Sequence, residues 1–218
     1  GSVVTFNSGE DSNAVLSGFT IQNGYNNYGA GIATNTSDPT LSNLIIQNNE
    51  ATSSGGGMTF YYSNSILTNT IFRGNHAQYG GGVNTFMENP TINNVLIINN
   101  TSSNGGAGIR LDDGNFSISN ITVCNNISSG DYAGIYDTGT LDSVQNAVIW
   151  GNSPDAVQDI LKINNSVVEN GNNLSGTNII TSNPLFVDAA NGDYHLSDYS
   201  PAIGAGTSDG TPTTDIDG

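Results

Sequence analysis

One phrase of sequence recurs through most of this chain of 218 residues, and its spacing limits the fold more than any other feature. In this phrase, one aliphatic residue or methionine follows glycines or other small residues. A second phrase recurs beside it and ends in asparagine, as in LSNLIIQNN from Leu41, LTNTIFRGN from Leu67 and INNVLIINN from Ile92. The first phrase occurs as GAGIATN, GGGMTFY, GGGVNTF, GAGIRLD and YAGIYDT, starting at Gly29, Gly55, Gly80, Gly106 and Tyr132. Both phrases repeat every 25 or 26 residues, a period typical of solenoid proteins.

The pattern inside each repeat favours strands. Apolar residues alternate, as at Ile121 and Val123, and the frequent Gly, Asn, Ser and Thr disfavour helix interiors. Three short strands per repeat predict an all-β fold, a right-handed parallel β-helix of about seven coils stacked roughly 4.8 Å apart. We expect the coils to span residues 1–182, with a shortened coil near Ile163. The proline-containing segment 183–218 is expected to be an irregular cap of the same domain, folded over the last coil.

Stacking in register would place like residues above like. The glycines before the aliphatic residue are then turn and packing residues rather than a phosphate site, since no helix follows them. The predicted internal ladders are Leu41/Leu67/Ile92/Ile118, Ile46/Phe72/Ile97/Val123/Ile149 and Ile32/Met58/Val83/Ile109/Ile135. The predicted asparagine columns are Asn43/Asn69/Asn94/Asn120/Asn146 and Asn49/Asn75/Asn100/Asn126/Asn152.

The two phrases together resemble the repeats of right-handed parallel β-helix proteins. They are most similar to bacterial surface proteins related to polymorphic outer-membrane proteins and to the pectate-lyase-like superfamily. The segment from Asn183, which begins NPLFVDAANGDYHL, is similar to the closing segment of secreted β-helix proteins that end in a surface-anchoring region. The resemblance implies a secreted or cell-surface bacterial protein and leaves its activity open.

Composition excludes several partners. The formal net charge of −16, with 3 Lys+Arg against 19 Asp+Glu, repels nucleic acids and anionic lipid surfaces. The longest apolar runs are too short for a membrane span, and no secretion signal opens the chain. The single cysteine, Cys124, cannot form an internal disulfide. Because the chain opens abruptly on the strand-like GSVVTF, we expect it to belong to a longer protein.

One outward-facing strip is a candidate binding surface. If Ile109 points inward, the alternation predicts that its neighbours point outward and that equivalent residues of adjacent coils join them. Aromatic rings stack on sugars while amides and carboxylates bind hydroxyls, so the strip predicts polysaccharide or cell-surface glycan binding, and adhesion. Ordinary exposed strand residues are the alternative. The strip consists of Thr59, Tyr61, Asn84, Phe86, Arg110, Asp112 and Tyr136.

An enzyme of the same fold is the second hypothesis. A polysaccharide lyase needs a cation and a base, and Arg73, Arg110 and Lys162 are the only Lys and Arg residues of the chain. A glycoside hydrolase needs two facing carboxylates, for which Asp112, Asp113 and Asp137 are candidates, although Asp137 has inward parity or lies in a turn and adjacent acids are common in loops. We predict no catalytic residue and leave open a purely structural spacer.

A second outward strip is unusually aliphatic and suggests a covered face, by a partner, a second copy or a further segment. Local inward orientation of these residues is the alternative. An ice-binding face would need regular Thr ranks, and only Thr20 and Thr122 fit. The strip is Ile45, Ile71, Leu96 and Val148, with Ile98, Cys124 and Trp150 two places on.

No cofactor is predicted, and calcium is the one ion that the sequence makes plausible. Hard oxygen ligands occur close together in DAANGD and at the end of the chain, although their spacing is not that of an EF-hand and plain turns have similar sequences. The candidate ligands are Asp188, Asn191, Asp193, Asp209, Asp215 and Asp217. The histidines, His76 and His195, are expected to be surface residues.

Overall fold

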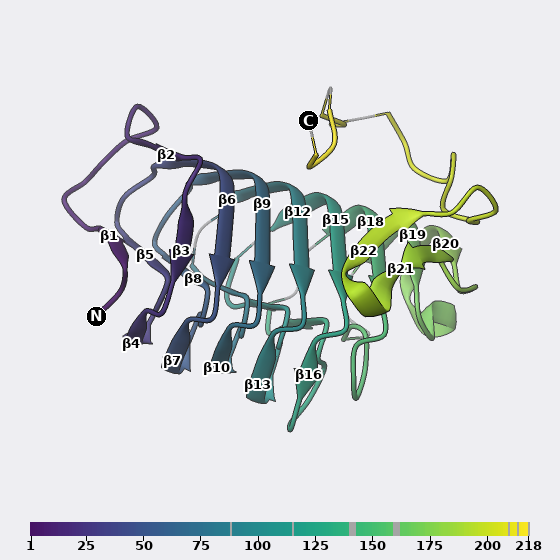
Figure 1. The fold of residues 1–218 in the computed structure, drawn as a ribbon, viewed down its shortest axis with the longest axis horizontal. Helices are drawn as coiled ribbons and strands as arrows, with labels where there is room; N and C mark the ends of the chain where they lie inside the picture. The colour runs from purple at the N-terminus through teal and green to yellow at the C-terminus, as the bar shows by residue number, and fades with distance from the viewer. Residues whose placement is uncertain are drawn as a thin grey trace.

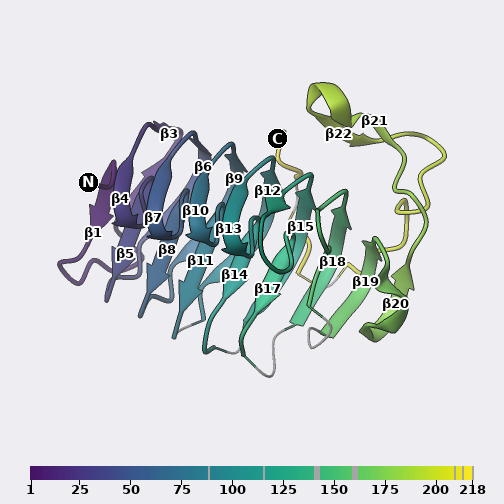
Figure 2. The same ribbon diagram turned by 90° about the horizontal axis from the view of Figure 1, so that it is seen from below.

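The structure, a computed structural model, describes residues 1–87, 89–114, 116–139, 143–158, 162–208, 210–212 and 214–217. Three parallel sheets wind around one apolar core, as Figure 1 and Figure 2 show from two directions. Every pair of neighbouring strands in these sheets is parallel, because each strand pairs with its equivalent one coil away. The predicted all-β parallel solenoid is therefore confirmed.

The strands fall into three sheets and one separate hairpin. Sheet A contains β1 (Val4–Phe6), β5 (Ile32–Asn35), β8 (Met58–Tyr61), β11 (Val83–Phe86), β14 (Ile109–Leu111) and β17 (Ile135–Asp137). Sheet B contains β2 (Val15–Ser17), β3 (Thr20–Gln22), β6 (Thr40–Gln47), β9 (Ile66–Arg73), β12 (Thr91–Ile98), β15 (Ser117–Cys124), β18 (Ser143–Trp150), β19 (Lys162–Val168) and β20 (Ser175–Ile180). Sheet C contains β4 (Tyr25–Tyr28), β7 (Glu50–Ser54), β10 (His76–Tyr79), β13 (Thr101–Gly105) and β16 (Ile127–Ser128). The hairpin is antiparallel β21 (Phe186–Asp188) and β22 (Asp193–Leu196), and the two short 3-10 helices are η1 (Gly171–Asn173) and η2 (Ala189–Asn191).

Five coils of the described chain contribute a strand to all three sheets, fewer than the seven expected. After them, β17 extends sheet A, and β18, β19 and β20 extend sheet B. The cause is the shrinking repeat: Ser143 pairs with Lys162, and Lys162 pairs with Ser175. Repeats this short have too few residues to form three strands and the turns between them.

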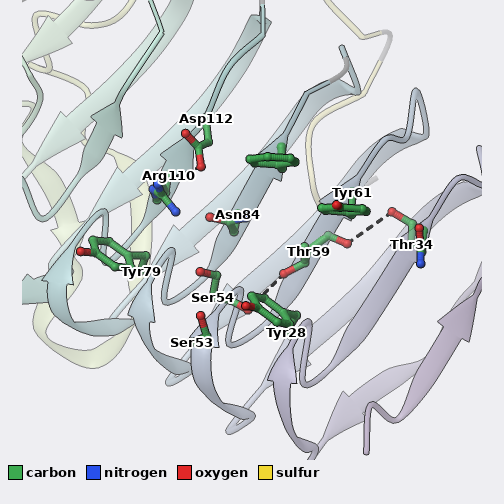
Figure 3. Close-up of a pocket in the computed structure, with 12 residues that line it drawn as sticks. Tyr28, Thr34, Ser53, Ser54, Thr59, Tyr61, Tyr79, Asn84, Arg110 and Asp112 are labelled. Atoms are coloured by element: carbon green, nitrogen blue, oxygen red, sulfur yellow. Dashed lines mark hydrogen bonds and ion pairs between the residues drawn. The ribbon is translucent and has the colours of Figure 1, made fainter.

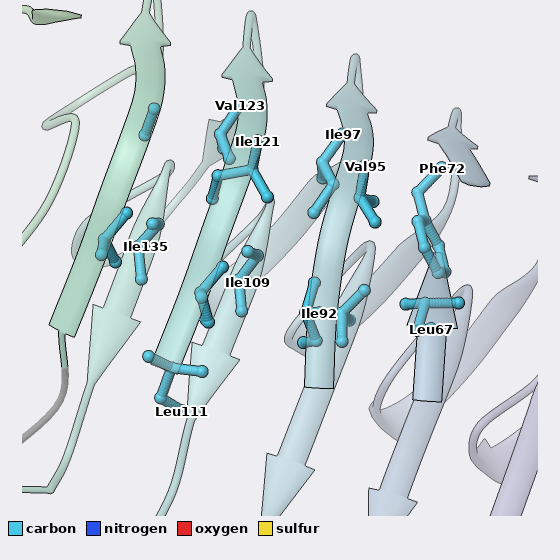
Figure 4. Close-up of a cluster of buried hydrophobic side chains, with 14 of the residues drawn as sticks. Leu67, Phe72, Ile92, Val95, Ile97, Ile109, Leu111, Ile121, Val123 and Ile135 are labelled. Atoms are coloured by element: carbon cyan, nitrogen blue, oxygen red, sulfur yellow. The ribbon is translucent and has the colours of Figure 1, made fainter. Parts of the chain in front are cut away.

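The predicted apolar ladders are confirmed and form the core (Figure 4). Ile46 pairs with Phe72, which pairs with Ile97, and all three side chains are fully buried. The glycine-phrase ladder shows the same register from Ile32 to Ile135. Each coil therefore buries one apolar residue per ladder, and stacking supplies its neighbours above and below.

Both asparagine columns are present. The inner column from Asn49 to Asn152 is buried, and from Asn75 onward each side chain accepts two hydrogen bonds from the asparagine of the preceding coil. Asn49 Oδ1 accepts from the backbone N–H of Gly24 instead. The outer column, Asn43 to Asn146, lies within the long strands of sheet B in the left-handed conformation, with φ between 49° and 55°. This kink lets residues on both of its sides, such as Leu41 and Leu44, point into the core.

The C-terminal segment lies along the side of the solenoid, whereas we expected it to fold over the last coil. Nδ2 atoms of Asn120 and Asn146 donate to the carbonyl oxygens of Gly210 and Thr207, so the segment runs back across the outer asparagine column (Figure 1). The β21–β22 hairpin sits over the ends of the sheet B strands, where Asn125 Nδ2 donates to the Tyr194 hydroxyl at 2.8 Å. The first four of the six residues of β20 (Ser175–Ile180) remain exposed.

The position of the hairpin accounts for part of the burial of the aliphatic strip. Ile45, Ile71, Leu96 and Val148 point outward and are half-buried, so the expected parity holds. Ile98 and Cys124, expected on the same exposed face, are instead buried. Cys124 lies next to Tyr194, because the hairpin of the chain itself covers this end of the strip. No described helix has the length and apolarity that a membrane span requires.

Candidate functional site

A cavity of about 540 Å³ lies on the outer surface where sheet A meets the ends of the sheet C strands (Figure 3). Six of the seven residues predicted as the binding strip line it: Thr59, Tyr61, Asn84, Phe86, Arg110 and Asp112. The seventh, Tyr136, is outside the lining and stacks on Tyr132, with ring centroids 5.8 Å apart and ring planes 18° apart. The structure thus brings most of the strip together at one concave site.

Strand register arranges these residues in two ranks. Thr59 pairs with Asn84, and Asn84 pairs with Arg110, so the three form one rank across β8, β11 and β14. Tyr61 and Phe86 lie two places further along their strands and therefore on the same outward face. Thr59 and Asn84 are each only 4% exposed although they face outward, since taller side chains on both sides enclose them. They form the floor of the cavity.

The aromatic rank differs in one respect from the sequence prediction. The rings of Tyr61 and Phe86 stack 5.2 Å apart with planes within 4°, and Tyr62 packs edge-on against Tyr61 at 4.7 Å. Because neighbouring strands are about 4.8 Å apart, side chains at equivalent positions stack on each other along the solenoid axis. Each of these two rings therefore has one face covered by the other ring. The pair is a stabilised wall of the cavity rather than an open platform of two ring faces.

Arg110 is held at one end of the cavity. Its Nη2 lies 2.8 Å from Asp112 Oδ2, and Asp112 Oδ1 accepts a 2.6 Å hydrogen bond from the Thr138 hydroxyl. Its guanidinium carbon lies 4.6 Å from the ring centroid of Tyr79, a cation–π contact. These contacts fix the position of the guanidinium, and Asp112 balances its charge.

Sequence reasoning missed the second wall of the cavity. Tyr28, Ser54 and Tyr79 line it from the C-terminal ends of β4, β7 and β10 in sheet C. The alternation rule follows one strand at a time, so it could not indicate that another sheet faces the same space. A signal was present nevertheless: Tyr28 and Tyr79 each directly precede a glycine phrase, whose left-handed glycine turns the chain from sheet C into sheet A.

Two polar atoms of the site lack a protein partner among the described residues. Asn84 Oδ1 and Arg110 Nε are both buried, and neither forms a hydrogen bond within the protein. An unpaired buried polar atom costs about 1–3 kcal/mol, so such atoms point to a partner from outside the chain. An acceptor and a donor are therefore available at the floor and at the end of one cavity.

The carboxylates expected for hydrolysis do not face each other across the cavity. Asp112 is bound to Arg110, whereas Asp137 is buried with inward parity, and its Oδ1 accepts from the Gly139 backbone N–H at 2.6 Å. Asp113 is exposed in a left-handed turn. Asp112 is the one carboxylate among the described residues that line the cavity.

The candidate calcium ligands are spread over several local contacts. Asp188 accepts from Asn191 Nδ2 at 2.7 Å, and Asp215 accepts from the backbone N–H of Asp217. His195 bridges Asp193 at 2.6 Å and Asp217 at 2.8 Å. Within the described residues, no three acidic, histidine or cysteine side chains form a group that could hold a metal ion, and Asp209 lies outside those residues.

The chain matches no known protein family, no characterised protein and no solved structure. The assignment of the fold therefore rests on the repeat and on the geometry of the coils.

Proposed function

We propose that this protein binds a glycan in the cavity between sheets A and C, and that it does so as a secreted or cell-surface protein. The observation that carries the proposal is the unpartnered, buried Asn84 Oδ1 in the floor of a cavity with aromatic walls. Sugars present hydroxyl groups at the ring edge and C–H groups on the ring faces. They match a site that combines fixed polar atoms with aromatic side chains.

Binding without turnover fits this lining better than hydrolysis or elimination. A glycosidase requires two carboxyl groups about 5 to 9 Å apart on opposite sides of the sugar, and Asp112 is the one carboxylate in the described lining. A lyase requires a free cation beside the acidic group of its substrate, but Arg110 is already paired with Asp112. We therefore place the relation to β-helix polysaccharide enzymes second to an adhesion or glycan-binding role.

The test is a glycan array with the intact chain, followed by isothermal titration calorimetry on the glycans retained. Asn84→Leu keeps the branched shape of the side chain but removes its hydrogen-bonding groups, and we expect it to weaken binding roughly tenfold or more, a loss of about 1.4 kcal/mol. Asn104→Leu is the matched control, because Asn104 is exposed on sheet C and outside the cavity lining.

The controls decide between binding and its absence. Unchanged affinity in Asn104→Leu together with a loss in Asn84→Leu supports the site. If Asn84→Leu and Asn104→Leu both bind as tightly as the wild-type chain, the glycan binds elsewhere on the surface. Retention of no neutral or acidic glycan by the wild-type chain would overturn the proposed function.

A further inference from the structure

We infer that the cavity takes an uncharged sugar and that one pyranose ring of it inserts between Tyr28 and Tyr79. This inference rests on the proposed function and narrows it to a ligand class and a position. We call the space between the two rings, above Ser54, the tyrosine slot.

The register of sheet C creates the tyrosine slot. Tyr28 pairs with Ser54, and Ser54 pairs with Tyr79, so the three residues occupy equivalent places in three consecutive coils. Ser54 has a short side chain and is buried, so it leaves a gap between the two tyrosines. Figure 3 shows Tyr28 and Tyr79 on the same side of the cavity, with Ser54 between them.

The surroundings of the two tyrosines differ. Arg110 belongs to the coil that follows Tyr79, and its guanidinium covers the Tyr79 ring at 4.6 Å. The opposite face of Tyr79 is therefore turned toward the coil of Ser54. Tyr28 is 57% exposed, and it lies one coil before Ser54. A ring that enters the slot can contact aromatic surface on both of its sides.

The width of the slot selects a puckered ring. The two tyrosines are separated by two coil spacings, about 9.6 Å, so a group halfway between them is about 4.8 Å from each ring plane. Flat carbon surfaces pack at about 3.5–4.0 Å, and a planar base or indole would leave a gap on at least one side. A chair-shaped sugar carries axial hydrogens above and below its mean plane and fills the extra space.

The floor of the cavity supplies the polar contacts that a sugar needs. Asn84 Oδ1 can accept from a hydroxyl, and Arg110 Nε can donate to one. The Thr59 hydroxyl donates to the Ser54 carbonyl oxygen at 3.1 Å and keeps its lone pairs as acceptors. Thr59 and Asn84 are neighbours in register, so these groups span two adjacent coils beside the slot.

Charge excludes the acidic glycans. The chain carries a formal net charge of −16, and Asp112 neutralises the one cation of the described lining. A uronate or sulfate entering this cavity would meet a negative field. It would also compete with the Asp112 carboxylate for the guanidinium of Arg110. A neutral hexose or pentose ring pays no such electrostatic penalty.

The experiment measures binding of neutral and acidic oligosaccharides to the intact chain and to two tyrosine variants. The probes are oligomers of glucose, mannose, galactose, xylose and N-acetylglucosamine, together with oligogalacturonate and hyaluronate fragments. Tyr28→Ala removes one wall of the slot. Tyr25→Ala is its matched control, because Tyr25 is in the same strand with 59% exposure and lies outside the cavity lining.

We expect at least one neutral oligomer to bind, with little dependence on salt. We also expect affinity to fall roughly tenfold in Tyr28→Ala and to stay unchanged in Tyr25→Ala. Binding that prefers oligogalacturonate or hyaluronate would overturn the ligand class but keep the proposed function. Binding of a neutral oligomer that is lost in Asn84→Leu but not in Tyr28→Ala would overturn the slot alone. Thermal unfolding of each variant confirms that it is folded, which is expected for Tyr28→Ala and Tyr25→Ala because both tyrosines are exposed.

Discussion

The side-chain nitrogen Nδ2 of Asn100 donates to Oδ1 of Asn126 at 3.0 Å, and the backbone N–H of Asn100 donates to the same oxygen at 2.9 Å. In the other direction, Asn100 Oδ1 accepts from both nitrogens of Asn75. Asn100 has no exposed surface. The inner asparagine column is thus a chain of fully paired amides inside a turn, where the backbone groups would otherwise lack partners.

We expect Asn100→Ala to destabilise the protein by about 3 kcal/mol, because it leaves the buried backbone N–H of Asn75 without an acceptor and removes one of the two acceptors of Asn75 Nδ2. The free energy of unfolding in urea measures this change. Asn104→Ala, at an exposed asparagine of the same coil, is the control and is expected to change stability by less than about 0.5 kcal/mol. Equal stability of the two variants would contradict a structural role of the column.

Gly82 illustrates why the glycine phrase repeats. A Cβ atom at this position would lie 2.6 Å from the Gly108 carbonyl oxygen and 3.0 Å from Ile97 Cγ2. Because the carbonyl belongs to the backbone of the next coil, it cannot move aside alone. We expect Gly82→Ala to cost about 3 kcal/mol.

Gly9→Ala is the matched comparison for Gly82→Ala, also measured by urea unfolding. Gly9 has a left-handed φ of 75° but open space around its Cα, so only backbone strain of about 1 kcal/mol is expected. A loss in Gly82→Ala no larger than that in Gly9→Ala would show that the coils tolerate a methyl group at this position.

His195 joins two parts of the C-terminal segment through pH-dependent contacts with Asp193 and Asp217. The hydrogen bond to Asp193, followed by the one to Asp217, raises the pKa of His195 above its ordinary value of 6.5. Because this pKa is raised, the contacts of His195 with the two carboxylates stabilise the folded protein at pH values below 6.5. The stabilisation is lost as the pH rises through the folded pKa. The hydrogen bonds from His195 lower the pKa of Asp193, so its contribution is present above 3.8 and lost as the pH falls through its lowered value.

We expect Asp217→Asn to move the pKa of His195 back toward 6.5, because it removes one of the two carboxylates that bind the imidazolium. An NMR titration of the imidazole protons measures the pKa. Asp198→Asn, at an exposed acid of the same segment, should leave the titration of His195 unchanged. An unshifted pKa in Asp217→Asn would mean that the two residues are not paired in solution.

Cys124 reports on the position of the β21–β22 hairpin. Burial raises the pKa of its thiol to about 12, so the folded protein should react very slowly with a thiol reagent at pH 8 and fully after unfolding. Tyr194→Ala removes the hydrogen bond from Asn125 and the ring next to Cys124, and we expect it to accelerate labelling several-fold. Tyr199→Ala, in the same segment but 89% exposed, should not change the rate. Fast labelling of the wild-type thiol would contradict the described docking of the hairpin.

The repeat in the sequence was enough to predict most of the fold. A period of 25 or 26 residues leaves one way for apolar residues such as Ile46 and Phe72 to be buried, namely directly above one another, and it stacks Asn75 on Asn100 for the same reason. The same alternation placed Thr59, Asn84 and Arg110 on one outward face. These properties are local and periodic, and a sequence displays them directly.

Tertiary structure alone decided the rest. The second wall of the cavity, with Tyr28 and Tyr79, comes from a different sheet, and the angle between two sheets depends on turns and on core packing rather than on strand alternation. The stacking of Tyr61 on Phe86 follows from side-chain packing between coils. The path of the C-terminal segment follows from its hydrogen bonds to Asn120 and Asn146, which no repeat pattern encodes because the segment itself does not repeat. The sequence alone thus determined the scaffold, through a periodic requirement for burial. The cavity and its covering were decided by contacts between segments far apart in the chain.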